Sequence, residues 1–89
     1  MAYGTITVTT SATVIVAANS ARQKLHLVNT EEGKVVFIGP DASITKSNAI
    51  PLYETQTRDD AKAFGFWLGP IYGIVEVGTA DVRYWEVTK

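Results

Sequence analysis

The chain has 89 residues, of which 8 are basic and 9 acidic, and its formal net charge of −1 excludes the basic surface with which a domain attracts nucleic acid. It contains no cysteine, which excludes disulfides, thiolate metal sites and thiol nucleophiles together. The length predicts one domain, residues 1–89, with a modest core. No apolar run approaches the ~20 residues of a membrane helix, and the first residues lack the pattern of a secretion signal. We expect a soluble domain without an export signal of its own.

The first part of the chain is predicted to form short strands. Four segments have this character: Thr5–Thr10, Ala12–Ala17, Lys24–Asn29 and Val35–Ile38. They are rich in β-branched residues or alternate apolar with polar residues, as strands do. In the third of them Leu25 and Leu27 should share one face and His26 the other, because successive side chains of a strand alternate. Polar or glycine-containing turns separate the segments.

The middle of the chain is more polar. Asp41–Asn48 is predicted to be a connection with Ile44 tucked under it. Ile50–Tyr53 should be extended, since the residue before a proline avoids the helical region. Thr55–Lys62 is the most polar stretch, and both a long exposed loop and a single helical turn fit it. Phe64–Leu68 then reads as an aromatic strand.

The last third indicates a closing β-hairpin. Apolar residues alternate on both sides of the turn Gly78–Asp81, with Ile71, Ile74, Val75 and Val77 before it and Val82, Tyr84 and Val87 after it. Many short strands at close spacing, without a helical period, predict an all-β fold. We expect a small antiparallel β-sandwich, or a jelly-roll-like barrel, of about eight strands.

Residues that could carry chemistry do not converge in the sequence. His26 is the only histidine, so a metal site or a general base has no second imidazole or thiolate to join it. The acidic pairs at 31–32 and 59–60 are adjacent residues, which on a strand point to opposite faces, whereas paired-carboxylate catalysis needs convergence. The serines have no evident base. The sequence therefore predicts no enzyme, no cofactor and no metal site.

Aromatic residues suggest a contact surface instead. Six of them fall between Phe64 and Trp85, and strand alternation leaves Trp67 or Trp85 on an outer face. Exposed tryptophan is typical of interface anchors, although a small sandwich could also bury them all. We expect Trp67 and Trp85 to be buried in a contact with a partner, and Arg22, Arg58 and Asp59 to lie at its rim.

The order of these signals along the chain resembles a known group of proteins. The segments that carry the resemblance are Ala17-Ala18-Asn19 with Arg22, Leu25 and Asn29, then Val36–Gly39, Thr45, Asn48–Leu52, Gly69–Tyr72 and Gly78–Arg83. Together they are similar to small β-sandwich virion proteins of tailed bacteriophages, which decorate or cement a capsid or sit at the base of fibres. The similarity spans Thr10 to Glu86. The chain differs from those proteins at Glu54–Ala63, where its connection is longer and more charged.

The resemblance implies an all-β fold, no cofactor and assembly on a virus particle. Our hypothesis is a decoration or cement protein that is made in the host cytoplasm, binds the major capsid protein on the exterior of the virion and stabilises the shell. A homo-oligomer, with a trimer at local three-fold positions, would suit this role. The alternative is a fibre- or tail-associated module that binds host-surface glycans.

The N-terminus has two readings. Residues 1–4 are expected to be a flexible arm, and the threonine-rich segment after them carries little charge. Such a segment could add a strand to another copy or to the shell protein. The preferred interpretation is an ordinary first strand of the sandwich.

Overall fold

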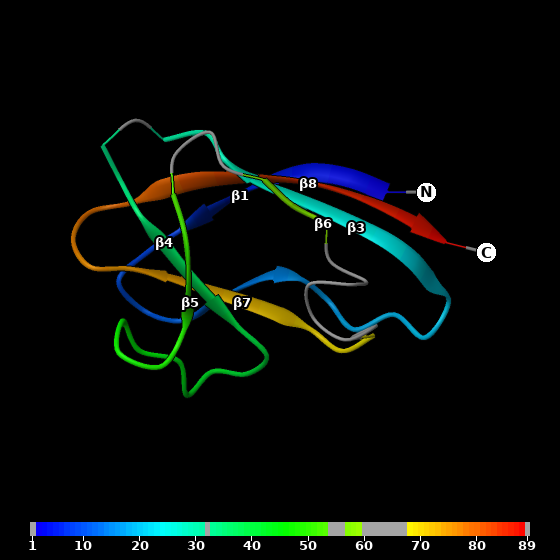
Figure 1. The fold of residues 1–89 in the computed structure, drawn as a ribbon, viewed down its shortest axis with the longest axis horizontal. Coiled ribbons are helices and arrows are strands. Elements are labelled where there is room, and N and C mark those ends of the chain that lie inside the picture. Colours follow the sequence, from blue (N-terminus) through cyan, green and yellow to red (C-terminus); the bar gives the residue numbers. More distant parts are fainter. Residues whose placement is uncertain (1, 32, 54–56, 60–67, 89) are drawn as a thin grey trace.

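The protein forms a two-layered β-sandwich, described by a computed structural model over residues 2–31, 33–53, 57–59 and 68–88. The strands are β1 (Ala2–Val8), β2 (Thr13–Val16), β3 (Arg22–Asn29), β4 (Val36–Gly39), β5 (Ile50–Leu52), β6 (Thr57–Asp59), β7 (Ile71–Val75) and β8 (Ala80–Thr88). Sheet A has the order β1-β8-β3-β6 and sheet B the order β2-β7-β4-β5, and every pairing is antiparallel (Figure 1). The predicted all-β sandwich is confirmed.

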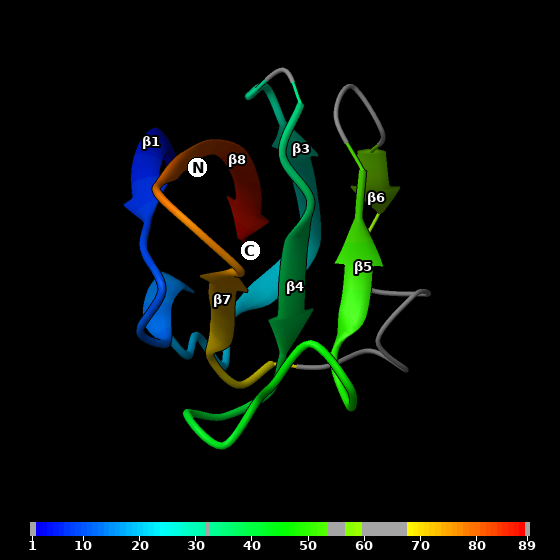
Figure 2. The same ribbon diagram turned by 90° about the vertical axis from the view of Figure 1, so that its left-hand side faces the viewer.

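The chain passes repeatedly from one sheet to the other. Of the consecutive strands, β4 and β5 are neighbours in sheet B, whereas each other pair in chain order is divided between the two sheets (Figure 2). Each sheet is therefore built from strands that are distant in sequence. The described residues contain no helix that is long and apolar enough to span a membrane.

The predicted closing hairpin is wrong. Strand β7 lies in sheet B and β8 in sheet A, so the residues between them turn a corner and do not join hydrogen-bonded neighbours. At this corner Gly78 has a φ of 74°, Val77 is 68% exposed and Lys34 Nζ donates to the Val77 carbonyl at 3.0 Å. The alternating pattern predicted each strand, but alternation specifies which residues share a face and not which strand is adjacent.

The core lies between the two sheets and receives side chains from both. Its members are Val8, Ile15, Val16, Leu25, Leu27, Val36, Ile38, Leu52, Ile71, Val75, Ala80 and Val82. Leu25 and Leu27 are buried while His26 between them is half-buried, which confirms the alternation predicted for this strand. Ile44 is also buried, as predicted, although it belongs to the connection between β4 and β5.

Asn29 is a fully buried polar residue at the end of β3. Its Nδ2 donates to the carbonyls of Lys34 at 2.9 Å and Leu52 at 3.0 Å, and its Oδ1 accepts from the amide of Glu31 at 2.9 Å. Burial of an amide is costly unless its groups are paired, and here both the oxygen and the nitrogen have partners. The side chain thus fixes the turn after β3 and links it to β5 in the other sheet.

Two of the predicted segments lie mostly outside the described residues. The aromatic strand Phe64–Leu68 lies outside them except for Leu68, which is not part of a strand. Most of Thr55–Lys62 lies outside them too, but Thr57–Asp59 forms β6, so the predicted loop or helical turn is wrong for these three residues. At the N-terminus residues 2–4 of the expected flexible arm belong to β1, which begins at Ala2, whereas Met1 lies outside the described residues. All seven residues of β1 pair with β8, from Ala2 opposite Glu86 to Val8 opposite Ala80.

Gly39 at the end of β4 shows how closely the connection to β5 packs. A Cβ atom built on this glycine would lie 2.3 Å from Cγ2 of the buried Ile44, well inside the closest contact that real Cβ atoms make. We predict that Gly39→Ala lowers the free energy of unfolding by about 1–3 kcal/mol, because an overpacked site must displace its neighbour. Urea unfolding followed by circular dichroism measures this change.

The Ile44→Ala background is the control for this prediction. Removing Cγ2 creates room for the new methyl group, so Gly39→Ala should cost less in that background than in the parent. An equal cost in both backgrounds would show that the clash with Ile44 is not the cause.

Candidate interaction surface

The outer face of sheet A carries a row of large exposed side chains. The register places Tyr3 of β1 and His26 of β3 opposite Trp85 of β8, one on each side. Trp85 is 52% exposed, Tyr3 is 81% exposed and His26 is half-buried. Residues directly opposite each other in an antiparallel pair have neighbouring side chains on the same face. We call this set the Tyr3–Trp85–His26 row.

Strand alternation in β8 explains why Trp85 faces outward. Its neighbours in the chain, Tyr84 and Glu86, face the interior, and Tyr84 packs against the core. On the inner side the Tyr84 ring lies over Gly4 of β1, where an added Cβ would come within 3.2 Å of it. Tyr84 and Trp85 therefore point to opposite faces of sheet A. One aromatic residue therefore contributes to the core and the other is left for a contact.

Polar groups adjoin the aromatic row along the same strands. In the next row Thr5 and Val28 lie on either side of Arg83, which is exposed. One row further, Thr7 Oγ1 donates to Asp81 Oδ1 at 3.1 Å. The row therefore has Arg83 and Asp81 on one side and the exposed Lys24, opposite Val87, on the other. This is the composition of a contact surface, in which aromatic anchors are bordered by a polar rim.

Arg22 is not at a surface rim, and this corrects the sequence expectation. Its side chain is buried, and Nε donates to Glu86 Oε2 at 2.6 Å. Nη1 donates to the Gly69 carbonyl at 3.0 Å and Nη2 to the Ala17 carbonyl at 2.8 Å. The guanidinium therefore joins β3, β8 and the segments beside β2 and β7. Its role is structural.

Asn19 extends this buried cluster. Its Nδ2 donates to Glu86 Oε1 at 3.3 Å, so both carboxylate oxygens of Glu86 accept hydrogen bonds. Its Oδ1 accepts from the amide of Ala21 at 2.9 Å, and its own amide donates to the Leu68 carbonyl at 2.8 Å. Charges are stable in the interior only when they are paired and hydrogen-bonded in this way. Sequence reasoning missed Glu86 because its partners come from distant segments.

The remaining predicted contact residues are described only in part. Trp67 lies outside the described residues. Arg58 and Asp59 are in β6, where Arg58 is the register partner of Leu27 and Asp59 that of His26. Asp59 therefore occupies the next position of the line that runs from Tyr3 through Trp85 to His26. The structure brings Asp59 and Trp85 onto the same line across sheet A and leaves Arg22 apart from them.

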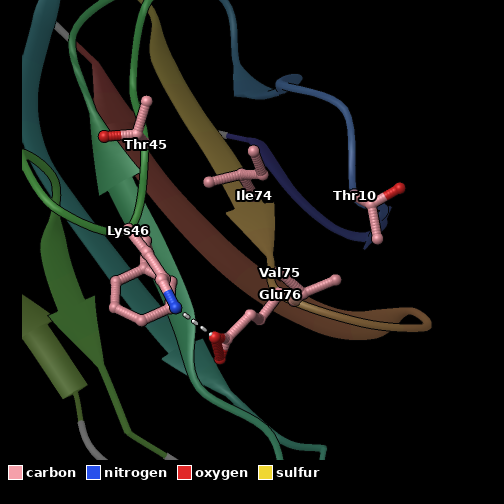
Figure 3. A pocket seen from close by; sticks show the side chains of 7 residues that line it. Thr10, Thr45, Lys46, Ile74, Val75 and Glu76 are labelled. Atoms are coloured by element: carbon pink, nitrogen blue, oxygen red, sulfur yellow. Dashed lines mark hydrogen bonds and ion pairs between the residues drawn. The ribbon is translucent and has the colours of Figure 1, made fainter.

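A second surface feature lies on the outer face of sheet B. A shallow hollow of about 200 Å³ is lined by Thr10, Phe37, Thr45, Lys46, Ile74, Val75 and Glu76 (Figure 3). Phe37 and Ile74 are register partners at its floor. Lys46 Nζ contacts Glu76 Oε1 at 2.6 Å, and this hydrogen bond, reinforced by the opposite charge, raises the pKa of Lys46. Strand alternation around Phe37 was the signal that could have predicted this hollow.

The described residues contain no group of three or more histidine, aspartate or glutamate side chains placed to hold a metal ion.

Comparison of the chain with protein-family models, with characterised proteins and with solved structures found no match. The functional argument therefore rests on the surface itself, where the exposed Tyr3 and Trp85 lie beside the half-buried His26 on the outer face of sheet A.

The buried pair of Arg22 and Glu86 generates a stability prediction. Arg22→Met should lower the free energy of unfolding by about 3–5 kcal/mol, because the Glu86 carboxylate is left in the interior without its charge partner. Denaturant unfolding measures the loss. The double variant Arg22→Met/Glu86→Leu should be more stable than Arg22→Met alone, since the unpaired charge is gone. If the double variant is as unstable as the sum of the two single variants, the two residues are not coupled.

Proposed function

We propose that this chain is a structural protein of a tailed-bacteriophage virion, which binds the outer surface of the capsid and stabilises the shell. The observation that supports the proposal most is the exposure of Trp85 beside Tyr3 on the outer face of a regular sheet. Aromatic side chains bury a large area at a small cost in conformational entropy, which makes them effective anchors. The partner is the major capsid protein, on the exterior of the virion.

The mechanism is mechanical. Each copy would lay the Tyr3–Trp85–His26 row across a joint between shell subunits, with Arg83 and Asp81 as polar neighbours of that contact. A stable contact of this kind buries roughly 800 Å² on each partner. Many copies on one shell add up modest individual gains, because opening one joint must then break several contacts. The proposal includes no catalytic activity and no cofactor, and the chain is synthesised in the host cytoplasm.

A fibre- or tail-associated module that binds host-surface glycans is the second candidate. The same observation favours it, because an exposed tryptophan with a tyrosine beside it can stack on the apolar face of a sugar ring. The two candidates differ in their partner. A glycan array probed with the purified protein should show binding for this second candidate and none for a capsid-binding protein.

Trp85→Ala tests the proposed contact. We expect it to weaken binding to purified shells at least about tenfold, because a central aromatic anchor contributes more than about 1.4 kcal/mol to a contact. Its free energy of unfolding should change by less than about 1 kcal/mol, since half of the side chain is already exposed. Cosedimentation with shells measures the first quantity and thermal unfolding the second.

Val77→Ala is the matched control, because Val77 is an exposed apolar residue at the corner between β7 and β8, away from the row. It should bind shells as the parent does. Equal binding by the parent and Trp85→Ala would show that the Tyr3–Trp85–His26 row is not part of the contact.

Quantitative mass spectrometry of purified virions tests the assignment independently. Hundreds of copies per particle support a capsid-wide role, and a handful support a location at the neck, tail or fibre. The absence of the chain from virions would overturn the virion proposal.

A further inference from the structure

Among the described residues the sandwich has four strand edges, which differ in how well they are protected against pairing with another chain. The edges are β1 and β6 in sheet A and β2 and β5 in sheet B. Unpaired edges expose a row of N–H and C=O groups, and soluble proteins blunt them with short strands, charges, prolines or bulges. An edge without any of these devices is suited to pairing.

Three of the edges carry such devices. Strand β5 has three residues and contains Pro51, which has no N–H to donate. Strand β6 also has three residues, two of which are the charged residues Arg58 and Asp59. Strand β2 has four residues, and its register shifts between Val14 and Val16. Each of these edges is short, and each has a proline, a charge or a register shift that disfavours an added strand.

Strand β1 has none of them. It is seven residues long, from Ala2 to Val8, contains no charged residue and no proline, and keeps an unbroken register with β8. In the described part of the chain no strand pairs with its other edge. From this contrast we infer that the edge of β1 pairs antiparallel with β1 of a second copy of the chain, which joins two copies of sheet A into one continuous sheet. The inference does not rest on binding to a capsid.

A second copy fits this edge because the strand is complementary to itself. An antiparallel overlap of all seven residues puts Thr5 opposite Thr5 of the second copy, at a two-fold axis. On the outer face Tyr3 then faces Thr7, an aromatic and β-branched pair of the kind that stabilises sheets. On the inner face Ile6, which is half-buried, faces Gly4 and gains cover. No charge opposes a like charge in this pairing.

The two-fold arrangement also explains why pairing would stop at two copies. A seven-residue antiparallel overlap makes about six to eight backbone hydrogen bonds and uses the β1 edges of both copies. An isologous contact of this kind is closed, so it gives a dimer and no fibre. The outer faces of both copies end on the same side of the joined sheet. Two Tyr3–Trp85–His26 rows would therefore lie on one surface.

Single cysteines test the pairing cleanly because the chain has no cysteine of its own. Residues directly opposite each other in an antiparallel pair have Cα atoms about 4.5–5.5 Å apart, within the range that a disulfide bridges. We expect Thr5→Cys to form disulfide-linked dimers under mild oxidation at least roughly tenfold faster than Thr79→Cys. Thr79 is exposed in the segment before β8 and serves as the control. Equal rates, read from non-reducing gels, would overturn the proposal.

A charge exchange at the same position tests the register. The parent should have the mass of two chains by light scattering. Thr5→Glu and Thr5→Lys should each have the mass of one chain, because like charges meet at the axis, whereas an equal mixture of the two should return to two chains. Glutamate at this position lies beside Arg83 within the same chain, which favours the folded monomer, and circular dichroism compares each variant with the parent.

Other outcomes of these measurements overturn the inference. If the parent has the mass of one chain at several hundred micromolar, the two-fold pair is excluded. A mass of three chains excludes it as well. A dimer that persists in both charge variants places the contact elsewhere on the surface. A mixture of the two variants that stays at one chain excludes the register centred on Thr5. If a charge variant loses its β-sheet spectrum, the cysteine rates decide.

Discussion

Strand β8, which is nine residues long and hydrogen-bonded along both of its edges, is the element on which the rest of the structure depends. It pairs with β1 over seven residues and with β3 from Thr88 to Val82, so it joins the first and third strands to the last strand of the chain. Its inner face supplies Ala80 and Val82 to the core and Glu86 to the buried ion pair. Its outer face presents Trp85. A single strand with period-two alternation thus provides core, polar anchor and exposed surface.

Buried polar groups hold the connections that cross between the sheets. Asn29 fixes the turn after β3 through three hydrogen bonds, and Arg22 with Glu86 joins β3 and β8 to the segments beside β2 and β7. A core of aliphatic side chains is non-directional and tolerates several arrangements of the same strands. Hydrogen bonds to particular carbonyls are directional, and we interpret these residues as the groups that select one arrangement.

The proposed contacts use two different properties of sheet A. The Tyr3–Trp85–His26 row belongs to its outer face and depends on side chains, whereas the edge of β1 depends on backbone groups and on the absence of charge. These two surfaces meet at Tyr3, which is in the edge strand and also in the row. A partner on the face and a second copy at the edge could therefore bind at the same time, since each would use a different side of β1.

Local alternation and turn signals in the sequence predict most of the strands and which residues share a face. The shared face of Leu25 and Leu27 and the burial of Ile44 follow from them, whereas the structure shows that Trp85 faces outward and Tyr84 inward. The partners of these strands are known only from the fold: β7 and β8 lie in different sheets although their sequences resemble a hairpin, residues 2–4 belong to β1, and Arg22 is buried against Glu86, 64 positions away. Alternation is a property of a few neighbouring residues. The choice of partner, in contrast, depends on how all the strands bury their apolar faces at once, and no local pattern contains that information.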